Sequence, residues 1–311
     1  MVLNNFESLA AKVRGIPKRR AVVAAAADEH TLEAVIRASR EGFIDYILVG
    51  NKSGILDIGK KLGNPIPAGA IVDAAEETEA AEKAVALIRQ GRGDFLMKGK
   101  LETAALMRAV INKDTGIRKE NDMSHMAIFE IPAYHKIIFV TDGGMIPYPD
   151  FNQKKTILKN ALWLLRALGY DNPKVAVLAA SETINKRMPE TADAAALKEL
   201  GEKGEFGGCV IEGPISFDLA FSKEAAAIKG YASPVTGEVD LLLAPNIAAG
   251  NFIGKSFLFA GRAKMAGCIV GAAVPVVLTS RGASAEEKHL SILLAAAVSA
   301  TDAAASIQRQ N

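Results

Sequence analysis

Hydrophobic residues recur along this chain in two alternating patterns. Short continuous apolar runs are typical of strands buried on both faces of a parallel sheet. Between them, apolar residues recur at helical spacing, which is typical of amphipathic helices that cover a sheet. Strands are predicted at 20–26, 46–49, 94–97, 125–131, 136–141, 174–180, 208–212, 239–244, 268–271 and 275–279. Helices are predicted at 30–41, 76–90, 102–112, 153–168, 191–202, 216–228, 248–265 and 284–305.

This alternation predicts an α/β fold of mostly parallel sheets with helices on both faces. Segment 125–141 is the exception, because its two strands are joined by a short turn that favours an antiparallel pair. The stretch 143–149 is the densest in glycine and proline and is the predicted domain junction. The last helix is expected to pack back on the first domain and to place the turn before it at an interdomain cleft. The predicted domains are 1–142 plus 285–311, and 143–284.

Bulk composition excludes several classes of protein. The 311 residues carry a formal net charge of only +2, which gives no support for a nucleic-acid or membrane partner. The apolar run 21–27 ends in charged residues and is predicted to be a buried strand rather than a signal peptide. Cys209 and Cys268 lie on apolar runs without CxxC spacing, so both are expected to be buried thiols. We therefore predict a cytoplasmic protein.

The most informative turn follows the last predicted strand. The chain passes directly into Thr279, Ser280 and Arg281, and a helix begins at Ser284. Helix amino ends offer free N–H groups and a partial positive charge, and the arginine fork matches phosphate oxygens. These residues indicate a phosphate or oxyanion site. The alternative is an ordinary helix-entry turn with a solvated arginine.

Glu287 has two interpretations. Ser284 and Glu287 have the spacing of a capping box, in which each residue bonds to the backbone N–H of the other. A carboxylate one turn from an anion site is also suited to act as a general base. Spacing alone favours the cap.

A second cationic turn follows the predicted strand 94–97. Lys98 and Gly99 lie at its carboxyl end, and Thr103 and Arg108 lie on the next predicted helix. Backbone and cations in this arrangement are suited to hold phosphate. The alternative is a polar turn with solvated lysines.

Polar and glycine-containing turns follow three further strands. Ligands of α/β proteins bind outside the carboxyl ends of strands, so these turns are candidates for a substrate cleft. Asp142 has three possible roles, which are catalysis, metal binding and holding its turn. For the other residues of these turns, the alternative to ligand binding is an ordinary helix entry. The candidates are Asp142, Gly143, Gly144, Met145, Gly213, Pro214, Asn246, Gly250 and Asn251.

Absent motifs narrow the chemistry. The four histidines are scattered, so there is no zinc-ligand spacing. The sequence has no dinucleotide fingerprint after the first strand, no P-loop and no nucleophile elbow. Nucleoside-triphosphate hydrolysis and ordinary esterase chemistry therefore lose support.

Taken in chain order, these motifs resemble those of the phosphate acetyl/butyryl transferase family, most closely its butyryl branch. The resemblance covers about residues 95–295 and is carried by an ordered series of segments rather than by one motif. The segments are 97–99 with Thr103, 106–110, 124–130, 134–136, 141–150, 173–176, 186–189, 212–214 with Asp218, 233–235, 249–251 and 278–281.

The resemblance implies an isocitrate-dehydrogenase-like architecture and the reaction acyl-CoA + phosphate ⇌ acyl phosphate + CoA. It implies that Ser280 and Arg281 contact the phosphoryl group, that Arg108 assists, and that Glu287 takes the place of the base for the CoA thiol. Asp142 is the alternative base. The resemblance also implies a homodimer or larger homo-oligomer, no metal and no tightly bound cofactor, since acyl-CoA and phosphate are substrates. Butyryl-CoA is the favoured substrate, with acetyl-CoA or a branched-chain acyl-CoA as the alternative.

The chain departs from the family pattern at three positions. Glu287 and Asn246 replace aspartates, and Ile146 stands where asparagine is usual. The departures at Ile146 and Asn246 motivate a second hypothesis, a non-catalytic sensor of acyl-CoA or phosphate. A third hypothesis, a metal- and NAD-dependent hydroxyacid dehydrogenase, would require clustered carboxylates, for which Asp142, Asp218 and Asp240 are the candidates.

Overall fold

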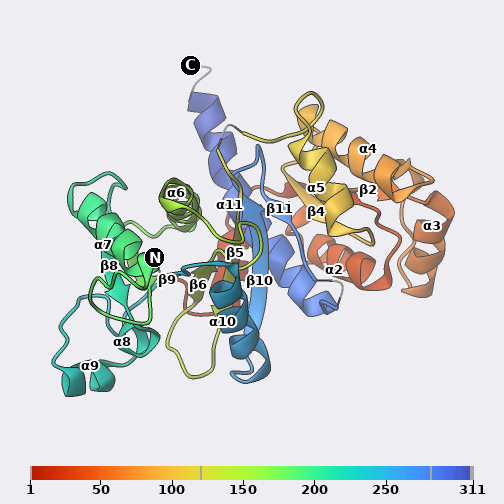
Figure 1. Cartoon of the computed structure of the whole chain (residues 1–311). Helices are drawn as coiled ribbons and strands as arrows, with labels where there is room; N and C mark the ends of the chain where they lie inside the picture. The colour runs from red at the N-terminus through yellow and green to blue at the C-terminus, as the bar shows by residue number, and fades with distance from the viewer. Residues whose placement is uncertain (1, 120, 281, 309–311) are drawn as a thin grey trace. The chain divides into compact units, whose positions relative to one another are not determined.

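The computed structural model describes residues 2–119, 121–280 and 282–308 (Figure 1). The chain folds as two compact units. The middle unit consists of the residues up to Asn5 together with Ser124–Lys264. The outer unit consists of Phe6–Met123 and the chain from Met265 onward.

The outer unit contains a mostly parallel sheet with the strand order β3-β2-β1-β4-β11-β10. Only β10 and β11 pair antiparallel among these strands. The strands are β1 (Arg19–Ala24), β2 (Ile44–Gly50), β3 (Ile71–Asp73), β4 (Phe95–Lys98), β10 (Lys264–Val270) and β11 (Val276–Val277). The helices are α1 (Phe6–Arg14), α2 (Glu29–Arg40), α3 (Lys52–Lys61), α4 (Glu77–Arg89), α5 (Thr103–Ile111) and α11 (Ala285–Gln308), with the 3₁₀ helix η1 (Ala68–Ala70).

The strand order fixes which helices cover which face of this sheet. From β1 the chain moves outward to β2 and β3, and it then returns across the sheet to β4. Since parallel crossovers are right-handed, α2 and α3 cover one face and α4 covers the other. Helix α11 packs on α2, and α5 packs on α4. The change of direction creates a switch point between β1 and β4, and ligands of open α/β sheets bind outside the carboxyl ends of strands at such a point.

The middle unit contains strands in the order β5-β6-β9-β7-β8. The predicted antiparallel pair is confirmed, since Phe129 pairs with Ile138 and Ala127 with Val140, and the other neighbours are parallel. The strands are β5 (Ser124–Glu130), β6 (Ile138–Thr141), β7 (Lys174–Leu178), β8 (Val210–Ile215) and β9 (Leu241–Leu243). The helices are α6 (Phe151–Ala167), α7 (Pro189–Glu202), α8 (Phe217–Phe221), α9 (Lys223–Lys229) and α10 (Ile247–Phe259).

The fold class predicted from the sequence is therefore confirmed, but the units divide the chain differently from the predicted domains. The boundaries fall after Met123 and after Lys264, and the stretch 143–149 lies inside the middle unit. The pairing of β5 with β6 explains the first difference, because β6 in turn pairs with β9 and so ties the hairpin to the middle unit. Pairing of β11 with β4 ties the segment after Lys264 to the outer unit.

Several predicted elements need correction. Helices α1 and α3 and strand β3 lie where none was predicted. The predicted helix 216–228 is two helices, because Ser222 ends α8 and caps α9 by accepting a hydrogen bond from the Ala225 N–H. Helix α10 ends at Phe259, just before Gly261, and the chain then enters β10. Cys268 is buried as expected, but Cys209 is only half-buried because it precedes β8 instead of lying within it.

No helix in the described part of the chain is long and apolar enough to cross a membrane.

Candidate active site

In the outer unit, Lys98 and Gly99 lie at the carboxyl end of β4, next to β1. The Gly99 N–H donates to the Ala24 carbonyl at 2.8 Å, and the Lys100 N–H donates to the Ala25 carbonyl at 2.8 Å. A Cβ atom on Gly99 would lie 2.3 Å from the Ala25 carbonyl oxygen, so only glycine fits there. Lys98 is buried, which argues against the alternative of a polar turn whose lysines are solvated.

Helix α5 carries two of the candidate phosphate ligands. Thr103 is its first residue, and Arg108 lies in its last turn. Both side chains are exposed. They are therefore accessible to a dissolved anion.

At the other candidate turn, Thr279 is buried and Ser280 is exposed. Arg281 lies outside the described residues. The Glu287 N–H donates to the Ser284 Oγ at 3.1 Å, so Ser284 caps α11 as the spacing predicted. The Glu287 side chain is half-buried.

Sequence reasoning missed Lys288, which lies one residue beyond Glu287. Its Nζ is 3.4 Å from the Thr279 Oγ1 and 3.9 Å from the Asp28 Oδ2. Burial lowers the pKa of the Lys288 ammonium below its usual value, although the charges of Asp28 and Glu287 act to raise it. A signal existed in the sequence, namely a lysine just before the long apolar part of a helix.

In the middle unit, Asp142 organises the turn that follows β6. Its carboxylate is buried and accepts hydrogen bonds from four backbone N–H groups. Oδ1 accepts from Gly144 at 2.8 Å, from Met145 at 3.0 Å and from His125 at 3.3 Å, and Oδ2 accepts from Ile146 at 3.0 Å. Among the three possible roles, this geometry favours holding the turn.

The Asp142 turn packs against the first turn of α10. A Cβ atom on Gly250 would lie 2.6 Å from the Asp142 carbonyl oxygen and 2.9 Å from the Gly143 Cα. The Asn251 Nδ2 donates to the Gly143 carbonyl at 3.4 Å. Close packing therefore accounts for the glycine inside this helix, and it brings these candidates together.

Two departures from the family pattern have simple structural consequences. The Asn246 side chain caps α10 by accepting a hydrogen bond from the Ala249 N–H at 3.0 Å. Asparagine and aspartate cap helices about equally well. Ile146 contributes its backbone N–H to the Asp142 turn, a bond that does not depend on its side chain.

His125 is a second residue that sequence reasoning missed as a candidate. Its ring lies against Gly144, where an added Cβ atom would be 3.1 Å from the His125 Cγ. Burial lowers the pKa of this imidazole, and the Asp142 charge acts in the opposite direction. The Nδ1 atom is buried and has no hydrogen-bond partner among the described residues. A neutral imidazole thus borders the exposed Gly144.

The remaining candidates are placed differently from the prediction. Gly213 and Pro214 are buried within β8 and are not at its exit. A Cβ atom on Gly213 would lie 2.8 Å from the Val177 Cβ, so this glycine permits close packing on β7. Proline is tolerated there because β8 is the edge strand of the middle unit.

The dehydrogenase hypothesis requires clustered carboxylates, but its three candidates each contact different partners. Asp142 holds its turn, Asp218 pairs with Lys229 at 2.9 Å, and Asp240 pairs with Lys136 at 2.5 Å. Within residues 2–119, 121–280 and 282–308, no group of three or more His, Cys, Asp or Glu side chains is arranged to hold a metal ion.

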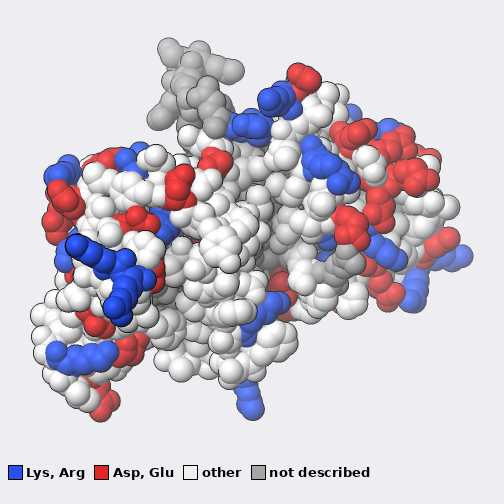
Figure 2. All heavy atoms as spheres, in the orientation of Figure 1, with Lys and Arg blue, Asp and Glu red and all other residues white. Residues whose placement is uncertain are grey.

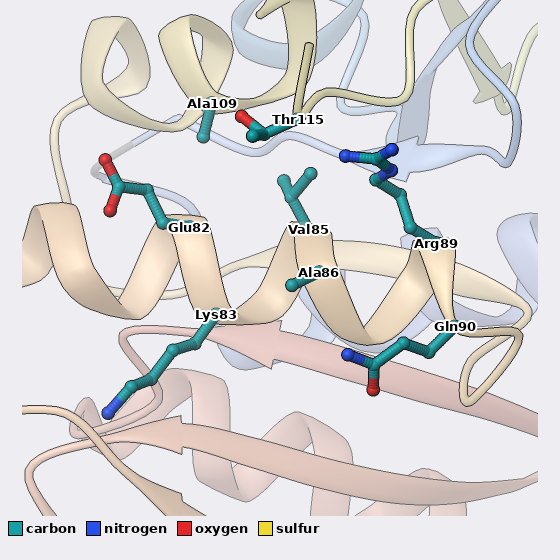
Figure 3. Close-up of a pocket in the computed structure, with 8 residues that line it drawn as sticks. All are labelled: Glu82, Lys83, Val85, Ala86, Arg89, Gln90, Ala109 and Thr115. Atoms are coloured by element: carbon teal, nitrogen blue, oxygen red, sulfur yellow. The ribbon is translucent and has the colours of Figure 1, made fainter.

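A pocket of about 700 Å³ lies between α4 and α5 (Figure 3). Val85 and Ala109 form its apolar lining, and Arg89 at its edge donates to the Asp114 carbonyl at 2.8 Å. Lys83 and Gln90 point away from α5 in Figure 3. This groove contains none of the sequence-predicted residues.

Among the described candidates, Lys98, Gly99 and Thr279 thus form one cluster at the β4 and β11 ends of the outer unit. Glycines and asparagines gather in another cluster around Asp142 in the middle unit. Residues 68–296 match the family described as phosphate acetyl/butaryl transferase. The phosphate butyryltransferase of Clostridium acetobutylicum is 40% identical over 96% of this chain and 99% of its own length. The phosphate acetyltransferase of Thermotoga maritima is 39% identical over 94% of this chain and 98% of its own.

A solved structure agrees with these relatives. The branched-chain phosphotransacylase of Enterococcus faecalis V583 matches with a TM-score of 0.79 and 30% identity, covering 90% of this chain and 99% of that one. The fold and these similarities define an α/β acyltransferase. The chain belongs to the phosphate acetyl/butyryl transferase family, as the ordered motifs predicted.

Proposed function

We propose that this protein catalyses acyl-CoA + phosphate ⇌ acyl phosphate + CoA, with butyryl-CoA as the preferred acyl donor. Family membership supports the reaction, and the 40% identity to a phosphate butyryltransferase over nearly the whole chain supports the acyl group. An acetyl or branched-chain substrate is the second candidate, because relatives with those names are also similar. One methylene in an apolar pocket changes the free energy of recognition by only about 1–3 kcal/mol.

The cluster in the outer unit is proposed to hold phosphate. Arg281 and Arg108 position the anion and partly neutralise it, which reduces charge repulsion as its oxygen attacks the thioester carbonyl carbon. Thr279, Lys98, Gly99 and Thr103 contribute hydroxyl, ammonium and backbone contacts. Ser280 is proposed to stabilise the tetrahedral oxyanion or the leaving sulfur, a role that its exposed side chain allows.

In the reverse direction a base takes the proton of the CoA thiol. We assign this role to Glu287 and the turn-holding role to Asp142, whose oxygens already accept four backbone hydrogen bonds. A thiol has a pKa of about 8.5, so only modest assistance is needed.

The cluster in the middle unit is proposed to bind CoA. Gly143, Gly144 and Met145 offer an accessible turn, and Asn246, Gly250 and Asn251 pack against it. Gly213 and Pro214 are proposed to support this site from within β8. No tightly bound cofactor is proposed, since CoA thioester and phosphate are substrates. A cytoplasmic location is proposed because both substrates are intracellular metabolites.

The test is CoA release, followed with a thiol reagent, from acetyl-, propionyl-, butyryl-, isobutyryl- and isovaleryl-CoA with and without phosphate. We expect phosphate-dependent release that peaks at butyryl-CoA. A peak at acetyl-CoA would move the protein to the acetyl branch. Tight CoA binding without release from any substrate would favour the sensor hypothesis, and reduction of NAD by a hydroxyacid would favour the dehydrogenase hypothesis.

A homodimer or larger homo-oligomer is also proposed, associating through α10. This helix is rich in apolar residues, yet Phe252 is 69% exposed and Phe259 is 81% exposed. Figure 2 shows an area beside α10 that is largely free of charged side chains. Exposed apolar patches of this kind mark protein–protein interfaces.

We expect light scattering to give a mass at least twice that of the 32.8 kDa chain. The double variant Phe252→Ser, Phe259→Ser should shift that mass toward the monomer, while Ile228→Ser, which alters an equally exposed residue on α9, should not. A monomeric wild-type protein would contradict the proposal.

A further inference from the structure

A small pocket lies at the switch point of the outer sheet. It has a volume of about 290 Å³, and its lining includes Asp28, Lys98, Gly99 and Lys288. Asp28 follows β1 and Lys98 ends β4, the two strands between which the chain changes direction. The volume lies just below the usual range for small-molecule sites, about 300–1,000 Å³, so the pocket suits a small ligand rather than whole CoA.

Two lysines bring positive charge into this pocket from buried positions. Lys98 is only 3% exposed and Lys288 only 5% exposed. Burying an ammonium is costly unless hydrogen bonds and opposite charge compensate for the lost water. Lys288 has three N–H donors, but the Thr279 hydroxyl at 3.4 Å and the Asp28 carboxylate at 3.9 Å are both distant partners. Its ammonium therefore has capacity for a closer anionic partner.

The acidic residues that line the pocket do not prevent an anion from binding to Lys288. Asp28 is held by α2, because its Oδ2 accepts from the Thr31 N–H at 2.9 Å and from the Thr31 hydroxyl at 2.5 Å. It is thus fixed beside Lys288 as an orienting group. Glu77 and Glu102 also line the pocket but are exposed, so water screens their charges.

We propose that Lys288 is a positioning residue for the phosphate substrate, and that its ammonium, oriented by Asp28, acts with Lys98 to bind inorganic phosphate in this pocket. The inference rests on the proposed function and extends it to a residue outside the phosphate-binding set. The contact with Thr279 links Lys288 to the candidate turn that leads into α11.

The test compares Lys288→Met and Lys288→Arg with Lys154→Met. Lys154 is the matched control, because it is 6% exposed and its Nζ lies 2.7 Å from the Asp193 Oδ2, in the middle unit. Initial rates are measured with phosphate and butyryl-CoA varied separately, and again with butyryl-dephospho-CoA. The shift of the unfolding temperature by inorganic phosphate, against sodium chloride at equal ionic strength, is measured for each protein.

We expect Lys288→Met to raise the KM for phosphate by about tenfold to a hundredfold and to leave the KM for butyryl-CoA within about twofold. Lys288→Arg should restore most of the phosphate affinity, and Lys154→Met should not change it. An unchanged phosphate KM in Lys288→Met would overturn the proposal. A rise only in the KM for butyryl-CoA, which disappears with butyryl-dephospho-CoA, would also overturn the proposal. The pocket would then bind a phosphate group of CoA.

The thermal measurement separates failure of this inference from failure of the proposed function. If the wild-type protein turns over no acyl-CoA, the proposed function fails, yet a phosphate-induced shift that is lost only in Lys288→Met still supports the pocket. Equal shifts in all variants would overturn it.

Discussion

Replacing Asp142 with alanine is expected to lower the free energy of unfolding by about 3–5 kcal/mol. The substitution removes the shared acceptor of four backbone N–H groups. Each buried donor left without an acceptor costs about 1–3 kcal/mol, although water will reach the exposed Gly144 N–H. Asp142→Asn should fall between wild type and alanine, because it retains one acceptor oxygen.

The measurement is urea unfolding followed by the fluorescence of Trp163, the single tryptophan of the chain, which lies on α6 in the same unit. Asp150→Ala is the control, since Asp150 is an exposed capping residue of α6 whose loss should cost about 1 kcal/mol. Equal losses for the two variants would show that Asp142 does not hold the turn. If the turn binds CoA as proposed, Asp142→Ala should also raise the KM for acyl-CoA more than that for phosphate.

The sequence predicted most of the fold because its strands are continuous apolar runs. Residues such as Phe95, Leu96 and Met97 are buried in β4 as their pattern required. The missed elements carry weak local signals. Helix α3 contains Gly54 and Gly59, each of which costs about 1 kcal/mol in a helix interior. Its stability comes from tertiary packing, since Gly59 lies against Ile66 with no room for a Cβ atom.

The candidate site was predictable where chemistry follows a strand end, and not where residues meet only in the fold. Lys98 ends β4, and Gly99 and Asp142 directly follow β4 and β6. Asp28 and Lys288 are far apart in sequence, and only the packing of α11 beside α2 and β1 brings them together. Likewise, Gly250 has an unusual place within a helix, but its partner, the Asp142 carbonyl, cannot be read from the sequence.

Replacing Gly99 with alanine is expected to lower the free energy of unfolding by about 2–3 kcal/mol and to reduce phosphate-dependent activity by at least about tenfold. The added methyl group would lie 2.3 Å from the Ala25 carbonyl oxygen and 2.7 Å from the Ala24 carbonyl oxygen. Neither atom belongs to a flexible side chain, so the end of β4 must move away from β1. This movement breaks the hydrogen bond from the Gly99 N–H to Ala24 and displaces Lys98 from its pocket.

The matched control is Gly69→Ala in η1, where an added Cβ atom meets nothing within 4 Å and φ is not positive. It should leave stability and activity close to those of wild type. The two effects of Gly99→Ala also have different meanings. The carboxyl end of β4 cannot accommodate the new methyl group without moving Lys98. A loss of stability with an unchanged KM for phosphate would therefore show that phosphate binds elsewhere. A rise in the phosphate KM that matches that of Lys288→Met would instead tie the switch point between β1 and β4 to phosphate binding.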